Sequence, residues 1–110
     1  MAPRKMELLY ARQAGIVKAL AHPIRIAILD FLEGGPQCVC DIAKHVGSER
    51  SNVSRHLSVM VNAGILDCHK TGLKVNYRLK CPCILDFFSC ISGVFKEQAK
   101  ENSQLLTALQ

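Results

Sequence analysis

The chain has 110 residues, which suits one domain with a modest core, and we expect residues 1–110 to form a single domain. Hydrophobic residues make up 49% of the sequence and charged residues 21%, so the composition excludes a disordered protein. The net charge of +5 at pH 7 suits a polyanionic partner, although a basic surface alone more often serves solubility.

The sequence also indicates a cellular compartment. It has no apolar run long enough to span a membrane, and residues 1–5 (MAPRK) are not followed by the apolar core of a signal peptide. We therefore expect a cytoplasmic protein with no membrane partner. Because thiols stay reduced in that compartment, the 6 cysteines are expected to be ligands or sensors rather than a disulfide framework.

The first third of the chain predicts two helices. Apolar residues recur at helical spacing over residues 7–20. Pro23 then suits the first turn of a second helix. Residues 24–32 are apolar on most sides, which predicts a helix buried on several faces, and the Gly-Gly-Pro sequence at 34–36 ends it.

The middle of the chain predicts two further helices joined by a tight turn. Residues 38–46 form a short helix with Cys38 at the N-cap position, and Gly47 ends it. Ser48 is a suitable N-cap for the second helix. Gly64 is expected to close that helix in the left-handed conformation. The predicted buried stripe of the second helix consists of Val53, Leu57, Met60 and Val61.

The last third predicts a β-hairpin and a long helix. Residues 65–69 and 75–79 have strand patterns, with residues 70–74 as the turn between them. Pro82 is expected to open the last helix, which is rich in apolar residues and has a possible break at Asn102 and Ser103. The predicted fold class is therefore mainly α with a β-hairpin.

A short helix, a glycine turn and a second helix with a polar face are typical of a helix-turn-helix unit that binds double-stranded DNA. Arg55 can donate two hydrogen bonds to guanine, and Asn52 can pair with adenine. Lys70 and Lys74 in the hairpin turn suit phosphate contacts. The other expected DNA-binding residues are Arg50, Ser51, Ser54 and His56. The alternative is an ordinary solvated helix face, but the basic hairpin that follows favours a winged helix.

Four motifs in this chain carry a resemblance to a known family: residues 20–29 (LAHPIRIAIL), 38–43 (CVCDIA), 51–57 (SNVSRHL) and 72–79 (GLKVNYRL). They are similar, in that order, to the entry helix, the arsenic- and cadmium-sensor box, the recognition helix and the wing of the ArsR/SmtB family of bacterial metal-sensing repressors. The resemblance implies a winged helix-turn-helix protein that forms a homodimer through its first and last helices. It also implies a repressor of its own operon, not an enzyme, that leaves operator DNA when an inducer binds.

The first Cys-x-Cys pair, Cys38 and Cys40, lies at the start of the third helix. Cysteine is a poor N-cap, and residues that break a local rule tend to mark function. A thiolate is favoured at a helix N-terminus, and arsenite, cadmium and lead prefer thiolate ligands. The resemblance implies a third cysteine after the box, which residues 42–44 lack. The alternative is that both cysteines are small, half-buried residues.

The second pair, Cys81 and Cys83, precedes the last helix. The resemblance places it where zinc sensors carry an Asp-x-His pair, so cysteines there imply a softer site. A full zinc site is absent because Val94 replaces the later histidine of that pattern. Cys90 lies seven residues beyond Cys83, roughly 10.5 Å along a helix axis, and could share an ion with it only from a partner subunit or after local unwinding. Its alternative role is a small core residue.

These observations lead to a DNA-binding repressor released by a thiophilic metal or metalloid, with As(III) favoured as inducer and no obligatory cofactor. An alternative is the same repressor sensing oxidants or reactive sulfur through cysteine oxidation. A thiol oxidoreductase would need a Cys-x-x-Cys sequence beside a βαβ pattern, and neither is present. A structural zinc module with four cysteine ligands is also conceivable, but the expected core needs no metal. Cys68 is expected to be structural.

Overall fold

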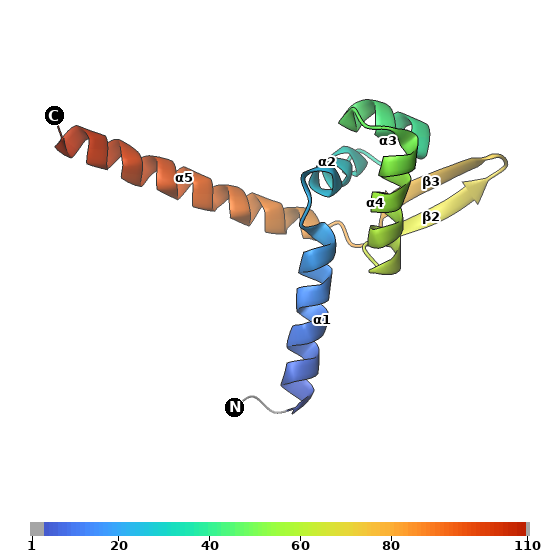
Figure 1. Cartoon of the computed structure of the whole chain (residues 1–110), viewed down its shortest axis with the longest axis horizontal. Helices are drawn as coiled ribbons and strands as arrows, with labels where there is room; N and C mark the ends of the chain where they lie inside the picture. Colours follow the sequence, from blue (N-terminus) through green and yellow to red (C-terminus); the bar gives the residue numbers. More distant parts are fainter. Residues whose placement is uncertain (1–3, 110) are drawn as a thin grey trace.

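A computed structural model of the protein describes residues 4–109 (Figure 1). It is mainly helical with a small antiparallel sheet, which confirms the predicted fold class. The helices are α1 (Arg4–Leu20), α2 (Pro23–Leu32), α3 (Val39–Val46), α4 (Arg50–Asn62) and α5 (Ile84–Ala108). The strands are β1 (Gln37–Cys38), β2 (Leu66–Thr71) and β3 (Lys74–Leu79).

The core lies where α2, α3 and α4 meet the base of the sheet. On α4, Val53, Leu57 and Met60 are fully buried, as their helical spacing predicts, whereas Val61, predicted in the same stripe, is only half-buried. Each such side chain contributes roughly 1.5–3 kcal/mol by its burial. The core residues from the other elements are Ala19, Leu20, Ile28, Leu29, Leu32, Ile42, Ala43, Ile65 and Leu66. This core holds α4 by one face and leaves its opposite face in solvent.

The hairpin is tighter than the sequence predicts. β2 and β3 pair as far as Thr71 and Lys74, so only Gly72 and Leu73 form the turn, whereas a turn over residues 70–74 was expected. Gly72 has a φ of +64°, and glycine at the first central position is typical of a two-residue hairpin turn. The two strands therefore extend further from the core than predicted.

A third strand was not predicted. β1 pairs antiparallel with β3, with Cys38 opposite Asn76, so the sheet order is β1-β3-β2. A strand of two residues is too short to show the alternation of apolar and polar residues by which a strand is recognised in a sequence. The pairing attaches the start of α3 to the wing, because Cys38 is both the end of β1 and the N-cap of α3.

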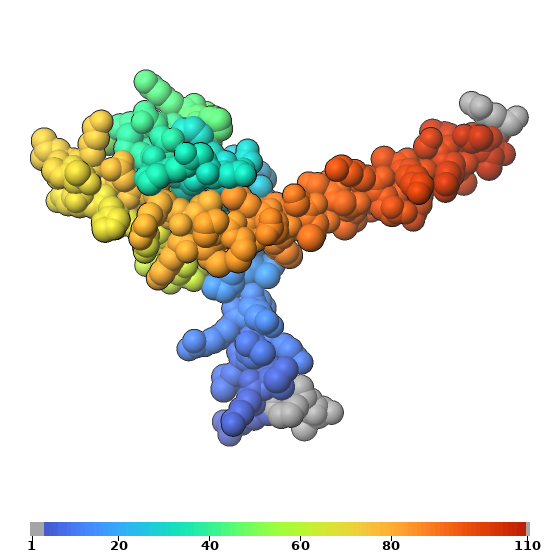
Figure 2. Space-filling view, turned by 180° about the vertical axis from the view of Figure 1, so that it is seen from behind, coloured from blue at the N-terminus to red at the C-terminus, as the bar shows by residue number. Residues whose placement is uncertain are grey.

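Helices α1 and α5 project from the core as two separate arms (Figures 1 and 2). α5 has 25 residues, a length of about 37 Å, and none of them is buried. It begins at Ile84 rather than at Pro82 and continues unbroken through Asn102 and Ser103, where a break was expected. The larger apolar side chains exposed on the two arms are Leu8, Leu9, Tyr10, Ile16, Val17, Phe87, Ile91, Val94, Phe95, Leu105, Leu106 and Leu109.

Candidate DNA-reading surface and cysteine sites

The two central helices form the predicted helix-turn-helix. α3 packs against α4, and Gly47, with a φ of +70°, ends α3 by donating its N–H to the carbonyl of Ala43. α4 begins at Arg50 with Glu49 as N-cap, so the prediction that Ser48 caps this helix is wrong. The Ser48 hydroxyl instead accepts a hydrogen bond of 2.9 Å from Nδ2 of Asn52. This bond orients Asn52 one turn into the helix.

The polar face of α4 contains all six residues that the sequence singled out, but in different environments. Four of them, Arg50, Ser51, Ser54 and Arg55, are exposed and make no hydrogen bond to another side chain within the described residues. Asn52 and His56 are half-buried and already hold protein partners. The exposed four are thus the residues that can reach a ligand without giving up a contact.

His56 faces the rest of the protein. Its Nδ1 accepts a hydrogen bond of 3.1 Å from Nε of Arg25, and its ring lies 4.3 Å from the ring of His22, centroid to centroid. Burial lowers the pKa of His56 below 6.5, and the positive charges of His22, Arg25 and Arg55 lower it further. No sequence motif predicted a role for Arg25, although it is the lone charged residue in the apolar run 24–29.

The hairpin presents cations near its tip. Lys70 and Lys74 are exposed on the two strands, and Leu73 in the turn is fully exposed at 101%. Arg78, nearer the core, forms an ion pair of 3.0 Å with Asp67 on the neighbouring strand. The tip therefore has unpaired lysines for an external anion, while Arg78 is engaged within the sheet.

The first cysteine pair is only partly assembled. Cys38 is half-buried and occupies the N-cap position of α3, as predicted, but its thiol makes no bond to the helix backbone. Its Sγ lies 3.3 Å from Oδ2 of Asp41, three residues along, and donates to that carboxylate. Cys40, two residues after Cys38, is exposed. The hydrogen-bond partner of Cys38 is thus a carboxylate rather than the second thiol.

The second pair is assembled. The Sγ atoms of Cys81 and Cys83 lie 3.1 Å apart, and both thiols are exposed in the turn that leads into α5. The shared hydrogen bond with Cys81 raises the pKa of Cys83, and the charge of Cys81 adds to the shift. Cys90 is also exposed, further along α5, so the structure does not place it in the core of the protomer.

No group of three or more His, Cys, Asp or Glu side chains gathers closely enough to hold a metal ion in the part of the chain that the structure describes. Each Cys-x-Cys pair therefore offers the sulfur ligands that a soft cation prefers, but it offers only two of them. The unpaired Cys68 is exposed on β2 opposite Tyr77. Burial raises the pKa of Tyr77, with a further contribution from Cys68, which marks a local structural contact on the wing.

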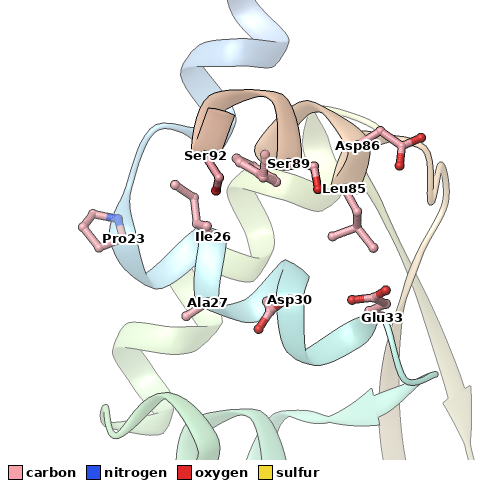
Figure 3. Close-up of a pocket in the computed structure, with 10 residues that line it drawn as sticks. Pro23, Ile26, Ala27, Asp30, Glu33, Leu85, Asp86, Ser89 and Ser92 are labelled. Carbon is pink, nitrogen blue, oxygen red and sulfur yellow. The ribbon is translucent and has the colours of Figure 1, made fainter. Parts of the chain in front are cut away.

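The first turns of α5 lie across an open cleft from α2 (Figure 3). The cleft has a volume of about 710 Å³, with Ile26 and Ala27 on one side and Leu85 and Phe88 on the other. Asp30, Glu33 and Asp86 also line it, and no cysteine is among its lining residues. α5 is therefore anchored only through its beginning, directly after the Cys81 and Cys83 pair.

No helix within residues 4–109 is both long and apolar enough to cross a membrane.

Comparison with known proteins identifies the family. Residues 22–67, from α2 to β2, match the family described as bacterial regulatory protein, arsR family. A helix-turn-helix transcriptional regulator of Mycobacterium tuberculosis, itself uncharacterized, is 30% identical over 105 residues, covering 94% of this chain and 92% of the relative. An arsenical resistance operon repressor of Staphylococcus xylosus is 33% identical over 70 residues, covering 64% of this chain and 67% of the relative.

A solved structure supports the same assignment over the full fold. The homodimeric winged helix-turn-helix DNA-binding domain of a possible ArsR-family regulator from Mycobacterium bovis superposes with a TM-score of 0.74 at 28% identity. The match covers 92% of this chain and 93% of that domain. The helix-turn-helix, the wing and the two relatives together show that this chain belongs to the ArsR family of bacterial transcriptional regulators, which are DNA-binding proteins rather than enzymes.

Proposed function

We propose that residues 1–110 act as one winged-helix domain that represses transcription by binding double-stranded operator DNA. α4 enters the major groove, where Arg55 reads guanine and its exposed neighbours Arg50, Ser51 and Ser54 contact bases or phosphates. Lys70 and Lys74 hold phosphates beside the groove. Asn52 contacts DNA through the amide atoms that are not used in its hydrogen bond to Ser48. His56 can contact DNA only through Nε2, because its Nδ1 accepts the hydrogen bond from Arg25.

The repressor acts as a homodimer joined through α1 and α5. Both helices expose apolar side chains along their length, and α5 buries none of its residues within one protomer. An exposed apolar surface of this extent marks an interaction site. A second copy of the chain is the occupant that the homodimeric relative supports. Two recognition helices then meet two half-sites on one face of the duplex.

The inducer is a thiophilic metal or metalloid, with As(III) favoured. The observation that carries this proposal is the 3.1 Å separation of the Cys81 and Cys83 sulfurs in the turn before α5. Two thiolates at that separation can converge on one soft ion. Cys90 of the partner subunit is the proposed third ligand, because α5 belongs to the dimer interface. Cys38 and Cys40 form a second candidate site, supported by the likeness to an arsenical resistance repressor.

The test is a DNA-release titration. Reduced protein is bound to fluorescent duplexes that tile the promoter of its own gene, and arsenite, cadmium or zinc is added while anisotropy is read. We expect arsenite to weaken binding by about 5- to 150-fold, the usual range of allosteric coupling. Indifference to all three ions would contradict the proposal.

Cysteine variants assign the site. The double variant Cys81→Ser with Cys83→Ser is expected to bind DNA normally and to lose the response to arsenite. Cys90→Ser should weaken that response if the third ligand comes from the partner subunit. Cys68→Ser is the matched control, because it also removes an exposed thiol and should respond like the wild type. Loss of the response only in the Cys38→Ser, Cys40→Ser variant would move the site to α3.

A second candidate function is redox sensing, which the same sulfur separation favours. Cys81 and Cys83 would each lose a hydrogen to hydrogen peroxide, an S–S bond would form, the O–O bond would break, and two waters would leave. Mass spectrometry after mild peroxide treatment would detect the loss of two hydrogens in the peptide containing residues 81–83. If DNA is released while this peptide stays reduced, redox sensing through this pair is wrong.

A further inference from the structure

A polar cluster that includes the half-buried His56 connects α1, α2 and α4. Arg25 on α2 donates from Nε to Nδ1 of His56 on α4 (3.1 Å) and from Nη1 to the carbonyl of Ala19 in the last turn of α1 (3.2 Å). His22, the N-cap of α2, places its ring 4.3 Å from that of His56. Residues 31 positions apart are thus joined by side-chain hydrogen bonding rather than by the apolar core.

The chemistry of this cluster suits arginine in particular. A planar guanidinium can donate in two directions at once, whereas a lysine ammonium carries a single point charge on a flexible stem. The carbonyl of Ala19 lies at a helix end, where carbonyls have no partner inside the helix. Only Ala19 and Leu20 of α1 are buried, so Arg25 adds a polar connection where α1 has few apolar ones.

We propose that Arg25 and His56 are positioning residues that couple the orientation of α4 to the end of α1. Arg25 sets the angle of α4 relative to α1, and α1 in turn belongs to the proposed dimer interface. A change in dimer geometry therefore reaches the recognition helix through this bond. The inference rests on the proposed function, since it requires α4 to read DNA and α1 to contact a second copy.

The coupling depends on the protonation of His56. Its Nδ1 accepts the Arg25 hydrogen bond only while that nitrogen carries no proton. The charged and titratable groups acting on His56 are His22 in the turn before α2, Arg25 on α2 and Arg55 on α4 itself. Burial and these groups lower the pKa of His56 below 6.5, so the bond persists at pH 7 and is lost as the pH falls through that lowered value.

The experiment compares specific with non-specific DNA binding. The wild-type protein first selects a duplex from a random-sequence library, and anisotropy then measures its affinity for this duplex and for a scrambled one between pH 8 and pH 5.5. We expect specific affinity to fall as the pH decreases, by roughly tenfold once His56 is protonated, which is the scale of coupling between contacting residues. Non-specific affinity should hold or rise, because protonation adds positive charge.

Two variants isolate the bond. Arg25→Lys keeps the charge and is expected to lower specific affinity about tenfold at pH 7 with non-specific affinity unchanged. His56→Asn keeps an acceptor that does not titrate, so the specific affinity of this variant should stay constant from pH 8 to pH 5.5, whatever its level at pH 7. In the double variant, the changes in specific affinity caused by Arg25→Lys and by His56→Asn should not add.

Three outcomes would overturn the inference. One is an equal loss of specific and non-specific affinity in Arg25→Lys, which would make Arg25 a phosphate contact. Another is an acidic fall in His56→Asn equal to that of the wild type, a result that stands even if Arg25→Lys does not fold. The last is strict additivity of the two variants. If the wild type selects no duplex at all, the proposed repressor function itself fails, which separates the two hypotheses.

Discussion

At the scale of single residues, the Cys81 and Cys83 pair has the clearest chemical signature. Cys83 shares a hydrogen bond with Cys81, and this raises the pKa of Cys83 above its ordinary value. A raised pKa leaves less thiolate at any given pH, and only the thiolate is alkylated. The proximity that favours binding of one soft ion thus also slows reaction with an alkylating reagent.

This property predicts an alkylation profile. The rate of iodoacetamide alkylation at Cys83 should rise at higher pH than that of an ordinary thiol, and Cys81→Ala should shift the rise to lower pH because it removes the bond. Peptide mass spectrometry across pH 7–10 measures both. A Cys40→Ala variant, which removes a thiol elsewhere, should leave the Cys83 profile unchanged. The same profile in all three proteins would show that the two sulfurs do not interact.

Arg55 and Lys74 should differ in what they recognise. Arg55→Ala is expected to cost about 1–3 kcal/mol of DNA affinity and to relax preference at one base pair, because a bidentate guanine contact is lost. Lys74→Ala should weaken binding to all duplexes alike and reduce the salt slope by about 1. Anisotropy over a salt series with single-base variants of the selected duplex separates them. Interchangeable effects would mean that Arg55 also contacts only phosphate.

At the scale of elements, the glycine after α4 fixes how that helix joins the wing. Gly64 has a φ of +81°, and the N–H of the next residue, Ile65, bonds to the carbonyl of Met60. A Cβ at Gly64 would meet no atom within 4 Å, so any penalty for a side chain there comes from the backbone conformation alone.

We therefore expect Gly64→Ala to lower the free energy of unfolding by about 1–2 kcal/mol, the cost of the left-handed conformation for a residue with a Cβ. Gly34→Ala is the control: its Cβ would lie 3.8 Å from the Phe31 carbonyl, an ordinary contact, and Gly34 does not adopt the left-handed conformation. Urea unfolding followed by circular dichroism at one fixed protein concentration measures both. Equal losses in the two variants would argue against the conformational explanation.

At the scale of the whole molecule, the two projecting helices form the surface that is proposed to dimerise. The protomer extends 63 Å along its longest axis, with a core confined to the region around α2, α3 and α4. α5 is anchored to that core only by its first turns, next to the cysteine pair. A ligand at Cys81 and Cys83 would therefore act where a small change in angle moves the far end of α5 most.

The proposed dimer predicts the effect of a charge on α5. Phe95, which is 63% exposed in the protomer, would be buried against the second copy, so Phe95→Glu should raise the dimer dissociation constant at least about tenfold. Sedimentation velocity would show a shift towards monomer, and DNA affinity should fall with it. Leu73→Glu, on the distant wing tip, should leave the association unchanged. A Phe95→Glu protein that remains a dimer would place the interface elsewhere.

The features that depend on neighbours along the chain could be predicted from the order of residues. Helical spacing of apolar residues predicted the buried face of α4, and glycines marked the ends of α3 and α4, because periodicity and backbone freedom are local properties. The same spacing predicted six residues on the opposite face. Arg50, Ser51, Ser54 and Arg55 are exposed there, whereas Asn52 and His56 are half-buried. Local reasoning failed at the cap of α4, where Ser48 bonds to the Asn52 side chain and not to the backbone.

The features that depend on segments remote in sequence became visible in the folded chain alone. The pairing of β1 with β3 involves two residues and could not appear as a pattern. The hydrogen bond between Arg25 and His56 exists because the core packs α2 against α4 across 31 positions. Each is a matter of orientation in space, which a linear order of residue types does not specify.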